Sequence, residues 1–510
     1  MHKRSRLPDP YLPPLLAAAS LAALVALPAC SRREPPAPAR AVRIGIHGDP
    51  ISLDPHLQNE VLTFAVLGNV FEGLTDFDRD LKLSPSLAAS WSSPDDLTWV
   101  FSLREGARFH DGRSVEADDV VASLERVRRH PRSGIASYAV EIQSVTAVDP
   151  RTVRIRTRRP FGGLLNKLAY LLVVPRDTPE EGAPPLGSGP YRIVSYEPGA
   201  MLRMEPAEGA PTGLPPLEFV PVRDRAERSE RLLSGRLDLV QDLALARVPQ
   251  VEASPCCRAV AQPSPVVEYL HFLSTDPRFS DPRVRLAIDL AIDRAALVET
   301  AFAGYAQPAS QIVGPGVFGY DAGIPITRRD LSRSRRLLAE AGHERGLDLT
   351  LEHREGRDPR ELVRQLAEAG VRVTAVSSPW PDLFARLSAR KIPFYYGGVS
   401  APSADASDIF DSFVHSRDAV WGYGRSNHSD YRNPEVDALV ERIAETSDLR
   451  ERKAFLQRGL RLLREDRRLL PLVNPYDVYG VSEALSWQPR FDRRLLGVDM
   501  RWGEAAGRGP

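Results

Sequence analysis

Short segments of alternating polar and apolar residues are interspersed, over most of the chain, with segments of helical periodicity. Strict alternation predicts a first strand over 41–46, and further strands are expected over 99–103, 145–156 and 192–196. Apolar residues three and four positions apart predict helices over 61–74, 114–127, 281–302, 332–341 and 434–467, the last as one long helix or two. Ser114 is the expected N-cap of the second helix. Because strands and helices alternate along the chain, the pattern predicts an α/β fold.

The N-terminal segment differs from the rest of the chain. Lys3, Arg4 and Arg6 precede an apolar run over 15–29, which is shorter than the roughly 20 residues that a membrane-spanning helix needs. This pattern predicts a secretory signal peptide over 1–29. The run ends at Cys30, and this resembles the lipidation site of bacterial lipoproteins, with a plain signal peptide as the alternative. A lipidated Cys30 and a proline-rich tether over 30–40 would hold an exported protein at the membrane, on the periplasmic or cell-surface side.

Length and composition are those of a large soluble protein. The 510 residues exceed the usual domain size of about 100–200 residues, so two or three lobes are expected. The 67 basic and 67 acidic residues balance, and because no basic stripe stands out, a nucleic-acid partner is not expected. Nearly all basic residues are arginine, and lysine occurs only at positions 3, 82, 167, 391 and 453. We interpret this bias as a compositional property and not as a site.

The chain carries no recognisable catalytic or metal-binding motif. It contains no G-x-S-x-G elbow, no P-loop, no H-E-x-x-H pair and no dinucleotide-binding fingerprint. Cys256 and Cys257 are adjacent, and Cα atoms about 3.8 Å apart lie below the usual disulfide range, so two free or partly buried thiols are expected. The sequence therefore favours a binding protein without cofactor or metal over an enzyme.

A series of motifs resembles, in order and spacing, those of one known family. The motifs are GDPISLDPH at 48–56, FEGL at 71–74, PSLAASW at 85–91, LTWVFSLREGARFHDG at 97–112, ADDV at 117–120, GSGPY at 187–191, and the segments 281–294 and 433–439. They are similar to motifs of the family 5 extracellular solute-binding proteins, the oligopeptide, dipeptide and nickel receptors of ABC importers. The resemblance covers essentially the whole chain after Ala41. Because the motifs consist of turn residues, caps and core aromatics, they describe a scaffold and not a reactive site.

The resemblance implies a two-lobed periplasmic binding protein-like fold of type II, in the large three-subdomain variant with a hinge and an interlobe cleft. By analogy, lobe I combines about 41–70, 184–266 and 475–503, subdomain II covers about 71–183, and lobe III covers about 267–474. The implied function is to capture a peptide-like or other small solute as a monomer, and to deliver it to the permease and ATPase of an ABC importer. The alternative is an extracytoplasmic sensing or chaperone-like lobe that is not coupled to transport.

The same resemblance indicates where the solute is bound. Peptide receptors of this family place a cleft aspartate upstream of a phenylalanine, but alignment on Phe410 puts serine or proline at that position. Asp405 and Asp408 lie nearby, and either could pair with a cationic solute or cap the following helix. Tyr396, just before these acids, is a further candidate. The departure from the family pattern puts ordinary peptide binding in doubt.

Three other residues complete the set of candidate solute contacts. Tyr138 falls where the nickel receptors place a cleft aromatic, with core packing as the alternative. Trp421 lies next to a glycine in a loop that could line the cleft. His271 stands at the start of the implied third lobe, and because the histidines lack paired ligand spacing, neither His271 nor the other histidines are expected to bind nickel.

Overall fold

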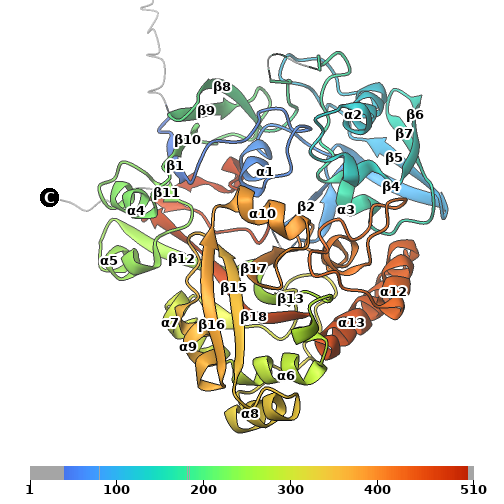
Figure 1. The fold of residues 1–510 in the computed structure, drawn as a ribbon. Helices are drawn as coiled ribbons and strands as arrows, with labels where there is room; N and C mark the ends of the chain where they lie inside the picture. The colour runs from blue at the N-terminus through green and yellow to red at the C-terminus, as the bar shows by residue number, and fades with distance from the viewer. Residues whose placement is uncertain (1–38, 80, 181, 183, 504–510) are drawn as a thin grey trace, which may run out of the picture. The chain divides into compact units, whose positions relative to one another are not determined.

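The computed structural model describes residues 39–79, 81–180, 182 and 184–503. The predicted signal peptide, Cys30 and the tether up to residue 38 lie outside these described residues. The described residues from Arg40 to Gly503 form one compact unit in which strands and helices alternate along the chain (Figure 1). The predicted α/β class is therefore confirmed.

The largest element is a sheet of twelve strands, whose central path runs β16-β15-β17-β13-β18-β11-β1-β10-β9-β8, with β12 and β14 also paired to β18. Its strands are β1 (Val42–Ile46), β8 (Tyr191–Glu197), β9 (Met201–Pro206), β10 (Leu217–Pro221), β11 (Leu239–Val240), β12 (Cys257–Pro263), β13 (Val266–Phe272), β14 (Ala306–Pro308), β15 (Leu347–Arg354), β16 (Val371–Ser378), β17 (Phe394–Ser400) and β18 (Leu469–Ser482). The segments that build it are thus drawn from almost the full length of the chain.

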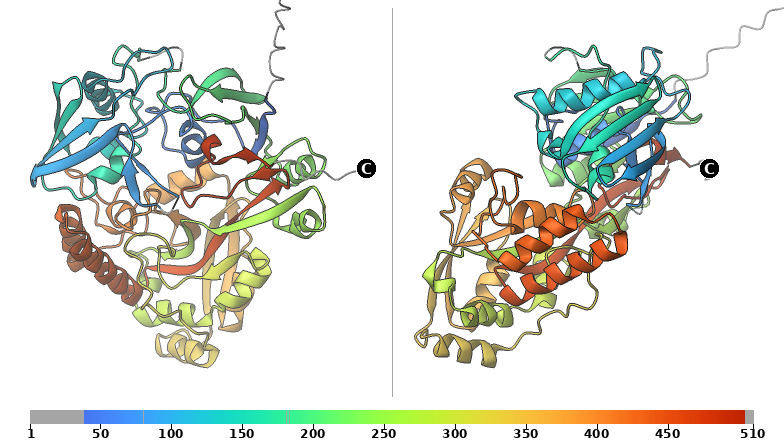
Figure 2. Two further views of the ribbon diagram at one scale, coloured as in Figure 1. Left: turned by 180° about the vertical axis from the view of Figure 1, so that it is seen from behind. Right: turned by 90° about the vertical axis from the view of Figure 1, so that its right-hand side faces the viewer.

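Strand β18 lies near the middle of this sheet and links its two halves (Figure 2). Its first half pairs antiparallel with β13, where His271 faces Leu469, and its second half pairs with β12, where Cys257 faces Ser482. The chain passes from β12 to β13 through Ser264 and Pro265. Strand β18 therefore carries the hydrogen-bonded ladder from one half of the sheet to the other, by pairing with β13 in its first half and with β11 and β12 in its second.

A second, four-stranded antiparallel sheet has the order β4-β5-β7-β6. Its strands are β4 (Ala88–Asp95), β5 (Thr98–Leu103), β6 (Ile142–Asp149) and β7 (Thr152–Thr157). The single strand predicted over 145–156 is therefore wrong, because a turn at 150–151 divides it into the hairpin β6–β7. Two short pairs complete the strands, β2 (Thr75–Phe77) with β3 (Leu83–Pro85), and β19 (Leu485–Ser486) with β20 (Arg501–Trp502).

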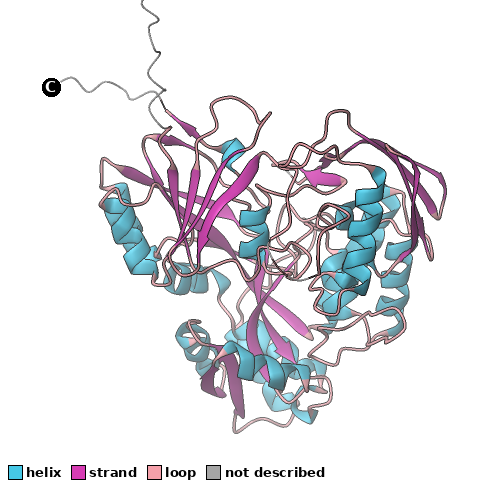
Figure 3. Cartoon of the chain, turned by 90° about the horizontal axis from the view of Figure 1, so that it is seen from above, coloured by secondary structure: helices cyan, strands magenta, loops and turns pink. Residues whose placement is uncertain are grey.

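Helices lie against the strands, as the cyan and magenta elements of Figure 3 show. They are α1 (Val61–Leu67), α2 (Ala117–Arg129), α3 (Leu164–Leu168), α4 (Arg225–Leu233), α5 (Val248–Glu252), α6 (Pro282–Ala291), α7 (Arg294–Phe302), α8 (Leu331–Glu340), α9 (Arg360–Glu368), α10 (Trp380–Ser388), α11 (Ser407–Ile409), α12 (Pro434–Glu445) and α13 (Leu449–Asp466). The segment 434–467 therefore forms two helices.

Capping explains where the predicted helix boundaries were wrong. Helix α2 begins after Glu116 and not at Ser114, because the Glu116 N–H donates to the Asp119 carboxylate at 2.9 Å. The helix predicted over 281–302 breaks at Ile292, and Asp293 caps a new helix by accepting the Ala296 N–H at 3.0 Å. The helix predicted over 61–74 ends earlier, at residue 67.

The buried apolar residues of the described chain form several separate clusters. One cluster consists of buried residues between 74 and 173, and it also includes Ala444 of α12. The Gly162 N–H donates to the Ala444 carbonyl at 2.9 Å, and a Cβ on Gly162 would lie 2.3 Å from the Thr446 carbonyl oxygen. The segment after the second sheet and α12 are therefore in close backbone contact, while the predicted lobe boundaries remain predictions.

Candidate ligand-binding cleft

A cavity of about 1050 Å³ opens between two stretches of chain that are far apart in the sequence. One wall comes from residues 125–167 together with Asn59, and the other comes from residues 400–426. The first wall includes the end of α2, the short helix η1 (Ala136–Ala139) and α3, while the second includes α11 and η4 (Phe410–Val414). Ligand sites commonly measure about 300–1,000 Å³, so this cleft can hold a molecule the size of a small peptide.

An ion pair crosses the cavity from one wall to the other. Lys167 on α3 donates a 2.7 Å hydrogen bond to Oδ1 of Asp408 on α11. Asp408 Oδ2 accepts the backbone N–H and the hydroxyl of Ser403, at 2.8 and 2.6 Å. Burial disfavours the lysine cation, but the Asp408 charge outweighs this effect, so the pKa of Lys167 is raised above its ordinary value. Lys167 and Asp408 therefore satisfy each other as a charged pair.

One carboxylate in the cavity has no such partner. Asp411 lies in η4, a π-helical turn in which the His415 N–H donates to the Phe410 carbonyl at 2.9 Å. Its Oδ1 is buried and has no hydrogen-bond partner among the described residues. Burial raises the pKa of Asp411 to about 7, and the charge of Asp408 adds to this rise while that of Lys167 opposes it.

Several charged groups act on Asp411. The carboxylates of Asp405 and Asp408 and the cations of Lys167 and Arg452 act on it. Of these groups, the Asp408 carboxylate disfavours the ionised form of Asp411 and the Lys167 ammonium favours it. A buried carboxylate in this situation either takes up a proton or attracts a cation. This part of the cavity is thus suited to a positively charged group.

Aromatic rings line both walls of the cavity. Tyr138 of η1 lies under the Lys167 ammonium, with 4.8 Å between Nζ and the ring centre. Across the cavity, the Arg159 guanidinium lies 4.3 Å from the ring centre of Trp421 and donates to the Tyr423 hydroxyl at 2.6 Å. These rings offer apolar contact area at little entropic cost.

Arginine side chains bring positive charge to the lining of the cavity. Some are neutralised, because Glu125 pairs with two arginines of α2 and Glu141 pairs with Arg159. Arg158 and Arg425 also line the cavity, are exposed, and form no ion pair within the described part of the chain. Guanidinium groups bind carboxylates through two parallel hydrogen bonds, so these two arginines are suited to an anionic group.

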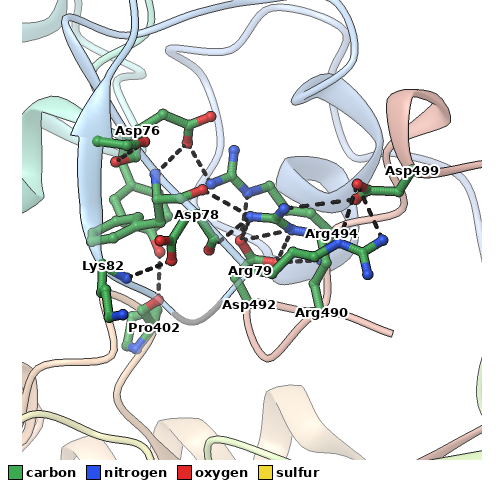
Figure 4. A network of polar contacts seen from close by, with 12 residues as sticks. Asp76, Asp78, Arg79, Lys82, Pro402, Arg490, Asp492, Arg494 and Asp499 are labelled. Carbon is green, nitrogen blue, oxygen red and sulfur yellow. Dashed lines mark hydrogen bonds and ion pairs between the residues drawn. The ribbon is translucent and has the colours of Figure 1, made fainter. Parts of the chain in front are cut away.

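A smaller cavity of about 60 Å³ shares Tyr138 and Pro402 with the large one. Tyr170 lines it and donates a hydrogen bond from its hydroxyl to the Pro402 carbonyl. Arg494 also lines it and is held in place, since its Nε donates to Asp492 at 2.9 Å within the polar network of Figure 4. Carboxylate partners therefore hold the Arg494 side chain in position.

The structure brings together three of the residues predicted to contact the solute. Tyr138, Asp408 and Trp421 all line the large cavity. Their contact with a solute remains a prediction. Cys30 lies outside the described residues, so its lipidation also remains a prediction.

Asp405 stays a prediction as a solute contact, and its charge is paired inside the protein. It does not line the cavities, and it is nearly inaccessible beside the equally buried Arg452. Arg452 Nη2 donates to Asp405 Oδ1 at 3.1 Å and also to the Ser407 hydroxyl at 2.9 Å. Asp405 therefore fixes α13 against the segment before α11.

His271 and Tyr396 also stay predictions as solute contacts; both are buried in strands, and neither lines the two cavities. The His271 Nε2 lies 3.0 Å from the Ile392 carbonyl oxygen, and burial lowers the pKa of this histidine to about 4. The ring of Tyr396 is covered by Arg357, whose guanidinium lies 5.4 Å from the ring centre. Both side chains stabilise the sheet.

Sequence reasoning missed Lys167, Asp411, Arg158 and Arg425 as cavity residues. For Lys167 a signal was present, because it is one of only five lysines in a chain whose bases are otherwise arginine. Asp411 lies three residues after Asp408 and directly after Phe410, the residue used for alignment. The family places its aspartate before that phenylalanine, so the alignment did not indicate Asp411. The arginines carried no local signal.

Comparison with known proteins identifies the scaffold. The model of the bacterial extracellular solute-binding proteins, family 5 Middle, matches residues 82–421, which is well over half of the chain. The chain belongs to this family. Among similar curated relatives of this family 5 protein, the glutathione-binding protein GsiB of Pectobacterium atrosepticum is 29% identical over 465 residues, covering 86% of this chain and 88% of the relative.

Solved structures agree on the fold. CtaP of Listeria monocytogenes, an ABC transporter substrate-binding protein, is 22% identical and superposes with a TM-score of 0.81, covering 92% of this chain and 100% of that one. The periplasmic binding protein DppA of Helicobacter pylori, in complex with the peptide STSA, is 22% identical with a TM-score of 0.77, covering 91% and 98%. The expected two-lobed type II fold is confirmed.

Membership of family 5 establishes a substrate-binding role for an importer. In the described residues, no helix has both the length and the apolar character that crossing a bilayer requires. The same part of the chain contains no group of three or more histidine, cysteine, aspartate or glutamate side chains that could hold a metal ion.

Proposed function

We propose that this family 5 protein captures a small zwitterionic, peptide-like solute in its cleft and presents it to the permease of an ABC importer. The observation that carries the proposal is the Asp411 carboxylate, whose charge and whose buried Oδ1 both lack a partner among the described residues. The α-ammonium of a peptide supplies one positive charge and three hydrogen-bond donors, so it would satisfy both needs at once.

The other end of such a solute has matching partners. Arg158 and Arg425 line the cavity without an ion pair among the described residues, so they can receive carboxylates. Trp421 and Tyr138 offer apolar area for side chains or for the peptide plane between the two charged ends. The name of the relative GsiB points to the same class, since glutathione is a short peptide with a free ammonium and two carboxylates.

Calorimetric titration at pH 7.5 tests this proposal with four probes: glutathione, trialanine, N-acetyl-trialanine and maltose. We expect glutathione or trialanine to bind, and N-acetyl-trialanine to bind at least about 10-fold more weakly, because it lacks the ammonium. Equal binding of the free and acetylated peptides would contradict the role of Asp411. Binding of maltose but of neither free peptide would contradict the peptide-like class.

Lobe closure follows from the connections of the large sheet. We place the hinge at the passage from β12 to β13 and at the middle of β18, where the Asn474 side chain donates to the Ser264 carbonyl at 2.7 Å. This placement supports the predicted boundaries near 266 and 475. Replacing Lys167 by methionine removes the ion pair across the cavity, so we expect a larger radius of gyration in solution scattering. Identical scattering curves for both proteins would count against a hinge at this position.

Export and lipid anchoring complete the proposed role. Cys30 would carry the lipid, and the mature protein would work beside the permease and ATPase as a monomer. Detergent phase partition of the wild type and a Cys30→Ala variant tests this step. The wild type is expected in the detergent phase and the variant in the aqueous phase, and recovery of both in the aqueous phase would contradict lipidation.

A further inference from the structure

Two adjacent thiols lie on a part of the molecule that the proposed cleft does not use. Cys256 is exposed in the turn after α5, while Cys257 opens β12 and is buried with 2% exposure. Neither residue lines the two cavities described above. The Cys256 Sγ also lies 3.1 Å from the Ser254 hydroxyl oxygen. Any chemistry of this pair is therefore separate from solute binding.

The two sulfur atoms face each other in spite of their neighbouring positions. In a regular strand, successive side chains point to opposite faces of the sheet. Here Cys256 still belongs to the turn, and this turn directs its Sγ to within 2.8 Å of the Cys257 Sγ. Two sulfur atoms this close need little side-chain movement to form a covalent bond of about 2.05 Å.

We propose that Cys256 and Cys257 are a redox-active pair that closes reversibly to a vicinal disulfide. The oxidant is another disulfide, either a small molecule or a thiol–disulfide oxidoreductase. The exposed Cys256 thiolate attacks one sulfur of that disulfide, forms a mixed disulfide and releases the first thiol of the oxidant. The Cys257 thiolate then attacks Cys256 Sγ and releases the second. The protein loses two protons and two electrons, and the oxidant disulfide is reduced to two thiols.

The environment of the two thiols assigns their order of reaction. Burial, followed by the hydrogen bond and charge of Cys256, raises the pKa of Cys257 to about 12. The influence of the Cys256 thiol on its neighbour disappears once Cys256 is held in the mixed disulfide, so Cys257 becomes easier to ionise for the second step. Cys256 is therefore the attacking residue and Cys257 the resolving residue.

Geometry also makes the bond labile. Consecutive Cα atoms are about 3.8 Å apart, below the roughly 4.4–6.8 Å of ordinary disulfides, so the closed ring stores strain and is readily reduced. Ring closure twists the peptide between the two residues. The Glu483 N–H donates to the carbonyl of Cys256 at 2.9 Å, at the end of the pairing between β12 and β18. Oxidation is therefore expected to loosen this end of the ladder.

Peptide mass spectrometry tests the proposal on the full-length protein. Trypsin releases the segment 248–258, which contains both cysteines and no other. After incubation with excess oxidised glutathione, this peptide is expected to lose about 2 Da and both alkylatable thiols, and dithiothreitol is expected to restore them. A peptide that keeps two alkylatable thiols, stops at a glutathione adduct, or appears as an intermolecular dimer would overturn the proposal.

Two variants distinguish the roles of the thiols. Cys257→Ser is expected to stop at the mixed disulfide and to carry glutathione on Cys256. Because Cys257 is buried, its replacement also perturbs packing, so the exposed Cys256→Ser provides the second measurement. It is expected to show at least about a 10-fold loss in the rate of thiol oxidation at the remaining, buried Cys257. An unchanged rate would contradict Cys256 as the attacking residue.

Discussion

Protonation of Asp411 is expected to make solute binding depend on pH. Burial raises the pKa of this carboxyl to about 7, so it is about half ionised at pH 7 and almost fully protonated at pH 5. The protonated form has no charge to pair with an α-ammonium, which itself remains charged below about pH 7.7. The ionised fraction falls from about 0.5 to about 0.01 between these pH values, so Kd is expected to rise about 50-fold, or about 2.3 kcal/mol.

Stability without solute is expected to change with pH in the opposite sense. In the unfolded chain an aspartate ionises near pH 3.9, whereas folded Asp411 keeps its proton until about pH 7. Between these values the unfolded state releases its proton first, so the contribution of Asp411 to the free energy of unfolding falls as pH rises. Binding thus strengthens over the pH range in which this contribution to stability declines. A general loss of structure at low pH could not produce that combination.

Titration calorimetry with trialanine at pH 5, 6 and 7 measures the pH dependence in three proteins. Wild type should show the 50-fold change. Asp411→Asn keeps the shape of the side chain and cannot ionise, so it should bind weakly and almost independently of pH. Asp348→Asn removes an exposed carboxylate that pairs with Arg372 away from the cleft, and it should behave as wild type. A 50-fold pH dependence that persists in Asp411→Asn would refute the reasoning.

Two further predictions concern contacts in the protein interior that do not involve the solute. Asp405→Asn leaves the buried Arg452 cation without its carboxylate. Urea denaturation should therefore show a free energy of unfolding that is lower by about 3–5 kcal/mol. A decrease below about 1 kcal/mol would contradict a structural ion pair. Gly187→Ala would place a Cβ 1.9 Å from the Val70 carbonyl oxygen. The free energy of unfolding, measured by thermal unfolding, is therefore expected to fall by more than about 2 kcal/mol. Gly48→Ala meets nothing within 4 Å and is the matched control, and equal melting temperatures for the two variants would contradict the close approach.

The scaffold was predictable from the sequence because its determinants are local. Polar and apolar residues alternate in the strand over 42–46. Asn433, directly before Pro434, caps α12 and marks its start in the sequence. Boundaries failed where a neighbouring side chain could replace the expected cap, as Glu116 and Asp119 did for Ser114. Periodicity reports which residues face the core, but it does not decide between competing caps only two residues apart.

The site was harder to predict because its chemistry depends on pairs that are distant in the sequence. Asp405 and Asp408 look equivalent in the sequence, and either could have met a solute. Their roles are decided by Arg452, which lies 47 residues from Asp405, and by Lys167, which lies 241 residues from Asp408. Each cation neutralises one acid, and no local pattern announces such a pairing. The acid that remains is Asp411.

Lys167 explains why the solute cation should bind to Asp411 and not to Asp408. The lysine ammonium already lies 2.7 Å from the Asp408 carboxylate and 4.8 Å from the centre of the Tyr138 ring, which is the environment that a peptide ammonium would need. A solute that displaced Lys167 would leave one buried cation without its partner, at a cost of about 3–5 kcal/mol. A solute that pairs with Asp411 breaks no existing hydrogen bond or ion pair, because its Oδ1 has no partner among the described residues. The arrangement of lower free energy keeps Lys167 paired with Asp408 as the bridge between the two walls. Solute binding then uses Asp411 and cleft closure uses Asp408, so the two processes reinforce each other.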